Sequence, residues 1–155
     1  MATRTLTLRA GSPRDIDMVE ALMAQAFDPR FGEAWTRGQC LGVLAMPGVR
    51  LLLAFLDDEP AGFAMTRGVL DEVELLLLAT LPAQRRRGVA ATMLRSLLAD
   101  AQSEGLRTMH LEVRAGNNAV DLYVAQGFAK VGERHGYYRG RTGHLFDAHT
   151  YSRAL

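Results

Sequence analysis

Apolar residues follow two different rhythms along this chain of 155 residues. The most apolar stretch, residues 75–80, has no polar side chain before its final threonine, which predicts a central strand buried on both faces. Directly afterwards, apolar residues recur at helical spacing over residues 89–101, and Gly105 predicts the end of that helix. The pattern therefore predicts a buried strand that leads through a short polar loop into an amphipathic helix.

The remaining patterns predict shorter elements on either side of this unit. Alternation over residues 5–9 predicts a strand, and Ser12 with Pro13 is expected to cap a helix over about 14–27. Helical spacing is expected again near residues 36–45 and 118–126. Further strands are expected at about 49–56, 60–69, 72–80 and 108–113, with two more within 128–154. This order predicts an α/β or α+β fold with a mixed sheet.

Composition limits the size and class of the protein. With 48% hydrophobic residues, the chain has enough apolar material for one core, so residues 1–155 are expected to form a single domain. The formal net charge of +1 provides no overall field for nucleic acid, and a single cysteine excludes an intrachain disulfide. No apolar run approaches the roughly 20 residues that cross a bilayer. We expect a soluble, cytoplasmic protein without a membrane or nucleic-acid partner.

The polar loop between the apolar strand and the long helix has the composition of an anion site. It contains three consecutive arginines, Arg85, Arg86 and Arg87, and then the small residues Gly88 and Ala90. Backbone amides at a helix N-terminus attract phosphate groups, whereas an arginine run by itself is more often a solvated surface. The chain contains neither the Lys-Ser/Thr phosphate loop nor a G-x-G-x-x-G turn. The pattern therefore favours a diphosphate other than that of a nucleoside triphosphate or a dinucleotide.

Several ordered motifs resemble a known family. The loop pattern Arg85-x-x-Gly88-x-Ala90 is followed by Leu-Glu-Val-Arg at residues 111–114, by Leu122-Tyr123 and by Gly127-Phe128. Together they resemble the GNAT acetyltransferases over almost the whole chain. Residues 69–72, Trp35-Thr36 and Tyr137-Tyr138 resemble the bacterial RimI type, which acetylates the N-terminal alanine of a ribosomal protein. The resemblance implies one GNAT domain with a largely antiparallel sheet of about seven strands flanked by about four helices.

The same resemblance implies acetyl-CoA as the cosubstrate. Its pantetheine arm is expected along the backbone of Leu78, Ala79 and Thr80, with the Leu78 amide facing the thioester carbonyl. Its pyrophosphate is expected on the loop and first helical turn, at Arg85, Arg86, Arg87, Gly88, Val89, Ala90 and Thr92. Asn117 is a further expected cofactor contact, for which a helix cap is the alternative interpretation. The connection over residues 115–118 is one residue shorter than in the RimI pattern, which leaves Asn117 and Asn118 as alternatives.

Acetyl transfer to an amine requires a base and an acid, and the resemblance assigns these roles to Glu112 and Tyr123. The alternative for Glu112 is a surface side chain on an alternating strand, and for Tyr123 a core aromatic. Glu74 is a reserve base, and Asp71 and Glu72 are candidates for attracting a basic acceptor. Tyr137 and Tyr138 are candidates for lining a peptide groove, while Cys40 is expected to be buried.

The sequence thus predicts an N-acetyltransferase that transfers acetyl directly from acetyl-CoA to a protein N-terminal amine, by resemblance the alanine of a ribosomal protein. Two alternatives are an acetyltransferase of small-molecule amines and a catalytically silent CoA-binding module. The four histidines show no metal-ligand spacing with cysteine or acidic residues, so no metal is expected. The acceptor and the oligomeric state stay open at this stage.

Overall fold

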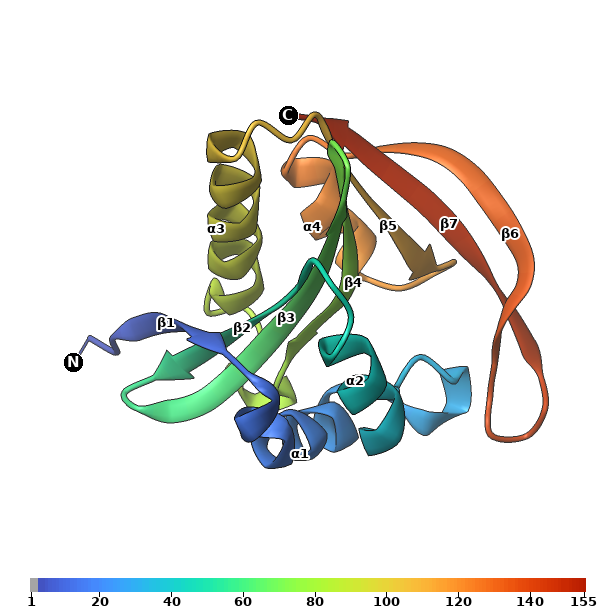
Figure 1. The fold of residues 1–155 in the computed structure, drawn as a ribbon. Coiled ribbons are helices and arrows are strands. Elements are labelled where there is room, and N and C mark those ends of the chain that lie inside the picture. Colours follow the sequence, from blue (N-terminus) through green and yellow to red (C-terminus); the bar gives the residue numbers. More distant parts are fainter. Residues whose placement is uncertain (1–2) are drawn as a thin grey trace.

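The computed structural model describes residues 3–155 and consists of one seven-stranded sheet with helices on both faces (Figure 1). The strands lie in the order β1-β2-β3-β4-β5-β7-β6, and every neighbouring pair is antiparallel except β4 and β5. The strands are β1 (Leu6–Gly11), β2 (Val49–Leu56), β3 (Glu59–Val69), β4 (Glu72–Thr80), β5 (Thr108–Arg114), β6 (Ala129–Arg139) and β7 (Leu145–Ala154). The expected mixed, largely antiparallel sheet is confirmed.

Within residues 3–155, four α-helices cover the sheet. Helix α3 (Val89–Ser103) and the short α4 (Ala119–Ala125) pack on one face, where Met93 and Leu94 are fully buried. Helices α1 (Ile16–Ala26) and α2 (Arg37–Leu44) cover the other face, where they bury Phe63 of β3 and, as expected, Cys40. The described part of the chain also contains the 3₁₀ turns η1 (Pro13–Asp15), η2 (Pro29–Phe31) and η3 (Pro82–Gln84).

The N-terminal helix begins later than the sequence indicates. Ser12 does act as a cap, because its hydroxyl accepts a hydrogen bond from the Arg14 amide, but the element it caps is the 3₁₀ turn η1. Helix α1 follows only from Ile16. The long helix ends where expected, since Gly105 takes the left-handed backbone with φ +78° just after α3.

Strand β4 departs from the expected central strand in a way that creates the site. Its pairing with β3 shifts register between Met65 and Thr66, which leaves Leu76 as an extra residue in a β-bulge. The bulge sends Leu75 to the core under α3 and Leu77 to the core under α1. Both faces of β4 thus contribute to a core, as expected for a central strand, although burial along the strand alternates between buried and half-buried positions.

Strands β4 and β5 then separate. They pair in parallel only from Glu72 with Thr108 to Leu75 with Leu111, although both strands continue beyond this point. The second half of β4 therefore has a free edge on the side of β5. This opening in the middle of the sheet is the feature that positions the candidate site.

Candidate active site

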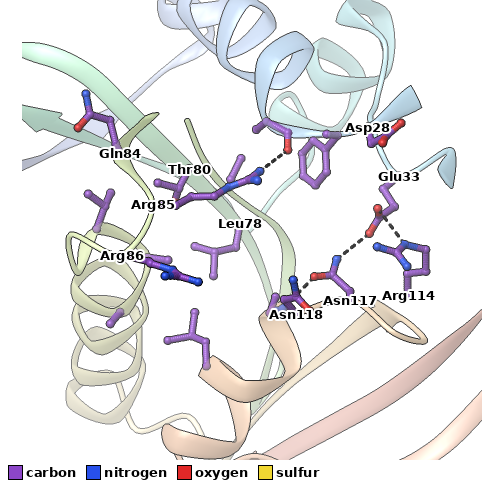
Figure 2. Close-up of a pocket in the computed structure, with 18 of the residues that line it drawn as sticks. Asp28, Glu33, Leu78, Thr80, Gln84, Arg85, Arg86, Arg114, Asn117 and Asn118 are labelled. Carbon is purple, nitrogen blue, oxygen red and sulfur yellow. Dashed lines mark hydrogen bonds and ion pairs between the residues drawn. The ribbon is translucent and has the colours of Figure 1, made fainter. Parts of the chain in front are cut away.

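Two cavities meet at the opening between β4 and β5. The larger, of about 610 Å³, extends from the end of β4 to the start of α3 and is shown in Figure 2. The smaller, of about 140 Å³, lies on the side of β5 and β6. Five residues line both cavities, namely Phe27, Glu33, Leu78, Asn117 and Ala119. A molecule in one cavity can therefore meet a molecule in the other beside Leu78.

The larger cavity ends at unpaired backbone donors. Within residues 3–155, no backbone hydrogen bond is donated by the amides of residues 86–91, since the first turn of a helix has no acceptor for them. Gly88 precedes α3 with φ +77°, and no atom lies within 4 Å of the position that a side chain would occupy there. Arg86 also takes the left-handed backbone, with φ +66°, and lines the cavity. This end of the cavity is built to accept an anion.

The three arginines of the loop have different roles. The Arg85 guanidinium donates a 2.7 Å hydrogen bond to the Ala26 carbonyl at the end of α1, as Figure 2 shows. Arg87 does not line the cavity. Of the three arginines, Arg86 is therefore the one that lines the cavity without a side-chain hydrogen bond to another residue of the described chain. Thr92 does not line the cavity either, and its hydroxyl accepts a hydrogen bond from Arg95. The anion site therefore consists mainly of backbone.

The free edge of β4 forms the wall of the larger cavity. The Leu81 amide bonds to the Ala61 carbonyl of β3, and alternate residues of a strand direct their amides to opposite edges. The amides of Leu78 and Thr80 therefore face the opening. The Thr80 hydroxyl is also buried without a hydrogen-bond partner in the described chain. Leu78, Ala79 and Thr80 all line the cavity, which agrees with the role expected for this strand.

Glu112 lies in the smaller cavity and is not a surface side chain. Its carboxylate accepts a 2.9 Å hydrogen bond from the Arg134 guanidinium of β6 and a 2.7 Å hydrogen bond from the Thr150 hydroxyl of β7. The side chain is only 11% exposed, whereas that of Arg134 is 62% exposed. Strands β6 and β7 thus hold the Glu112 carboxylate in place at the smaller cavity.

Tyr123 lines the same cavity from α4. It is buried, and its ring packs edge-to-face against Phe128 at 5.9 Å, so it is a core aromatic as well as a cavity residue. Burial, followed by the negative charge of Glu33, raises the pKa of the Tyr123 phenol well above its usual range. The pKa of Tyr138 is also raised, first by burial and then by the charge of Glu33, with smaller contributions from neighbouring groups. Both phenols therefore stay protonated at neutral pH.

The other acidic residues divide between the cavity and the surface. Glu74 lines the smaller cavity and lies 3.9 Å from His110, measured between carboxylate oxygen and ring nitrogen. Asp71 pairs with Arg107 at 3.8 Å, and neither Asp71 nor Glu72 lines a cavity. Tyr137 and Tyr138 line the smaller cavity, as does Trp35.

Asn117 caps a helix and also lines the cavities, while its contact with a cofactor stays a prediction. Its side-chain oxygen accepts a hydrogen bond from the Ala119 amide at 2.8 Å, which caps the start of α4, and the residue lines both cavities. Asn118 lines only the larger one. The Asn117 amide nitrogen donates to Glu33 at 3.0 Å, and Arg114 pairs with Glu33 at 3.1 Å (Figure 2).

Sequence reasoning missed Glu33 and its partner Arg114. Glu33 stands in a turn-rich segment without periodicity, and its partners lie 81 and 84 residues further along the chain. Only the tertiary structure brings these residues together.

The two cavities combine complementary chemistry. One ends in anion-binding amides, and the other holds a carboxylate, protonated phenols and the amide of Leu78. This arrangement suits transfer of an acyl group from a donor with an anionic tail to a nucleophile. Within residues 3–155, no group of three or more His, Cys, Asp or Glu side chains is placed to hold a metal ion. No helix in this part of the chain has the length and apolarity needed to span a membrane.

Comparisons with known proteins agree with this arrangement. Residues 16–128 match the model of the acetyltransferase (GNAT) family. The chain is 40% identical over 89 residues to the [ribosomal protein bS18]-alanine N-acetyltransferase of Salmonella typhimurium, covering 57% of this chain and 60% of that protein. The similarity thus spans less than two thirds of that relative's length. A protein of the same name from Haemophilus ducreyi is 32% identical over 129 residues, which cover 78% of this chain and 88% of the relative.

Solved structures show the same fold. The crystal structure of the ribosomal-protein-S18-alanine N-acetyltransferase from Escherichia coli has a TM-score of 0.86 at 25% identity, and the match covers 97% of this chain and 94% of that one. Arabidopsis thaliana NAA60 in complex with acetyl-CoA has a TM-score of 0.83 at 20% identity, with 97% and 99% covered.

Proposed function

The chain belongs to the GNAT acetyltransferase family, and on this premise we propose that it transfers acetyl from acetyl-CoA directly to the N-terminal amine of a protein. The observation that carries the proposal is the meeting of the two cavities at Leu78, with Glu112 and Tyr123 both lining the smaller one. Donor and acceptor would enter from different sides and react where the cavities join.

The residues of the larger cavity fit acetyl-CoA. Its pyrophosphate would bind the unpaired amides of residues 86–91 beside Gly88, with the Arg86 guanidinium nearby. Its pantetheine arm carries amide groups that would pair with the free edge of β4, in the manner of an added strand. The unpartnered Thr80 hydroxyl supports this fit, because a buried polar atom requires a hydrogen-bond partner. Acetyl-CoA would supply the acetyl group as a thioester.

The residues at the junction would carry out the transfer in one step. Glu112 would take a proton from the amine, directly or through water, as the nitrogen attacks the thioester carbonyl carbon. The Leu78 amide would donate a hydrogen bond to the oxyanion that develops on the carbonyl oxygen. Tyr123 would donate its phenolic proton to the sulfur as the carbon–sulfur bond breaks, which leaves CoA as a neutral thiol. Direct transfer uses no cysteine, in keeping with Cys40 being buried under α2.

The acceptor side supports a small N-terminal residue. The smaller cavity has a volume of about 140 Å³ and is walled by Trp35, Tyr137 and Tyr138, so it has room for little more than an amine and a small first side chain. The named function of the bacterial relatives is acetylation of the alanine of ribosomal protein bS18. By this similarity we propose a ribosomal protein that begins with alanine as the acceptor.

The test is release of CoA thiol from acetyl-CoA in the presence of a peptide that begins with alanine. The same peptide with a formylated N-terminus is the control for the acceptor. Glu112→Gln and Tyr123→Phe should each lower kcat by about 10²-fold or more while acetyl-CoA binds as to the wild type. Turnover of small amines but not of peptides would indicate an acetyltransferase of small molecules. Binding of acetyl-CoA without any turnover would indicate a catalytically silent binding module.

A further inference from the structure

Glu33 is the least exposed carboxylate at the junction of the two cavities, with 10% of its side chain exposed. Its two oxygens are both used: one accepts from the Arg114 guanidinium at 3.1 Å and the other from the Asn117 amide at 3.0 Å (Figure 2). Arg114 is 13% exposed, so this is a largely buried ion pair. A buried pair is sensitive to the loss of either partner, because the remaining charge is left without compensation.

Glu33 lies in the segment of residues 28–33, which is held in place by contacts with β6 and β7. Gly32 has φ +68°, and a side chain there would lie 1.8 Å from the Arg139 carbonyl oxygen, so only glycine permits this contact with the end of β6. Phe31 packs edge-to-face against Phe146 of β7 at 5.1 Å and lies 3.6 Å beneath the Arg114 guanidinium. The carboxylate is therefore presented by a segment anchored to the hairpin of β6 and β7.

The network continues from Glu33 into helix α4. The side chain of Asn117 donates to Glu33 through its nitrogen and accepts from the Ala119 amide through its oxygen, which fixes its orientation. Ala119 is the first residue of α4, and Tyr123 follows one turn later on the same helix. The start of this short helix is thus tied to the segment 28–33 rather than to the sheet alone.

We propose that Glu33 is a positioning residue for Tyr123, which acts by holding Asn117 and the first turn of α4 at the junction of the cavities. The inference rests on the proposed function insofar as Tyr123 is the acid. The position of the two residues supports it, because Glu33 and Tyr123 line the same cavity. Glutamine cannot replace the carboxylate, since two donors converge on residue 33 and an amide offers only one acceptor oxygen.

The experiment is a double-mutant cycle of Glu33→Gln with Tyr123→Phe, measured as kcat with an alanine peptide and as the dissociation constant of acetyl-CoA. Alone, Glu33→Gln should lower kcat by about 10- to 100-fold, the effect of a misplaced catalytic group. In the Tyr123→Phe background it should change kcat by less than about twofold, because the group it positions is already gone. The dissociation constant should change less than kcat does, since Glu33 lines the larger cavity but makes no hydrogen bond to the backbone of residues 86–91, where we place the pyrophosphate.

Two further variants sharpen the test. Asn117→Ala keeps the ion pair of Glu33 with Arg114 but removes the link to α4, and it should show the same dependence on Tyr123. Glu133→Gln is the matched control, because Glu133 is also ion-paired, with Lys130, but lines neither cavity. It should leave kcat unchanged.

A second measurement does not depend on turnover. Amide hydrogen exchange at Ala119 and in the rest of α4 should be faster in Glu33→Gln than in the wild type or in Glu133→Gln. An equal loss of kcat in both Tyr123 backgrounds, or unchanged exchange in α4, would overturn the positioning role. If the wild type acetylates no peptide, the proposed function fails, and the exchange measurement still decides whether Glu33 positions α4.

Discussion

The substitution Gly88→Ala separates the anion site from ordinary backbone strain. Gly88 has φ +77°, a conformation that costs a residue with a side chain about 1–2 kcal/mol. The unfolded chain loses freedom when glycine is replaced, which offsets about 0.4–1 kcal/mol of this cost. The net destabilisation is therefore about 1 kcal/mol, or a fall in Tm of about 2–4 °C for a domain of this size.

Binding should suffer for a different reason. The added methyl group would meet no protein atom within 4 Å, so it would project into the space where we place the pyrophosphate. Loss of one hydrogen bond to a charged group costs about 1.5–3 kcal/mol, which corresponds to at least about a tenfold rise in the dissociation constant of acetyl-CoA. Calorimetric titration measures this constant, and a thermal scan measures Tm.

The control is Gly143→Ala, in the turn between β6 and β7. Gly143 has φ +87° and equally open surroundings, but it lines neither cavity. The two variants should lose similar stability, and only Gly88→Ala should lose affinity for acetyl-CoA. Wild-type affinity in Gly88→Ala would refute the placement of the pyrophosphate against residue 88.

Three further outcomes follow from the structure. Arg85→Ala should lower the free energy of unfolding by about 1–2 kcal/mol with little effect on acetyl-CoA binding, because Arg85 bonds to the end of α1. Arg86→Ala should weaken acetyl-CoA binding with little effect on the free energy of unfolding, and denaturant titration and calorimetry measure the two quantities. The Arg9 guanidinium and the Ser12 amide lower the pKa of Asp15, so its stabilising effect is present above the ordinary aspartate pKa of about 3.9 and is lost as pH falls; the deficit of Asp15→Asn in chemical denaturation should shrink towards pH 3. The pKa of Tyr123 is raised in the folded protein, so the stability that its neutral phenol contributes is present below the ordinary tyrosine pKa of about 10 and is lost as pH rises above it. Tyr123→Phe removes this ionisation and should move alkaline unfolding, followed by circular dichroism, to higher pH.

Local patterns predicted most of the fold. The strands at 49–56 and 72–80 have the predicted bounds, since β-rich apolar runs there end at turn residues. The bulge at Leu76 was not predictable, because a bulge depends on the register of two strands and Leu76 stands within an unbroken leucine run. The change of face between Leu75 and Leu77 was missed with it.

The candidate site was likewise predictable where its residues are close in sequence and not where they are far apart. The loop around Gly88 could be predicted because its neighbours in sequence are also its neighbours in space. The partners of Glu112 on β6 and β7 could not, since Arg134 and Thr150 are 22 and 38 residues away and carry no local signal. The different behaviour of Arg85 and Arg86 depends on the end of α1, which the sequence places far away.

The position of β7 between β5 and β6 determines when the site can form during synthesis. Strand β7 follows β6 in the chain but separates β6 from β5, so β6 has no place in the sheet until β7 has been made. Thr150 arrives with it, and so does Phe146, against which the segment 28–33 packs. The loop around Gly88 and helix α3 can fold early from local contacts, whereas the smaller cavity requires contacts between distant parts of the chain, as far along as β7. A chain that is synthesised or truncated only as far as β6 should thus acquire the fold around α3 but not the junction of the two cavities.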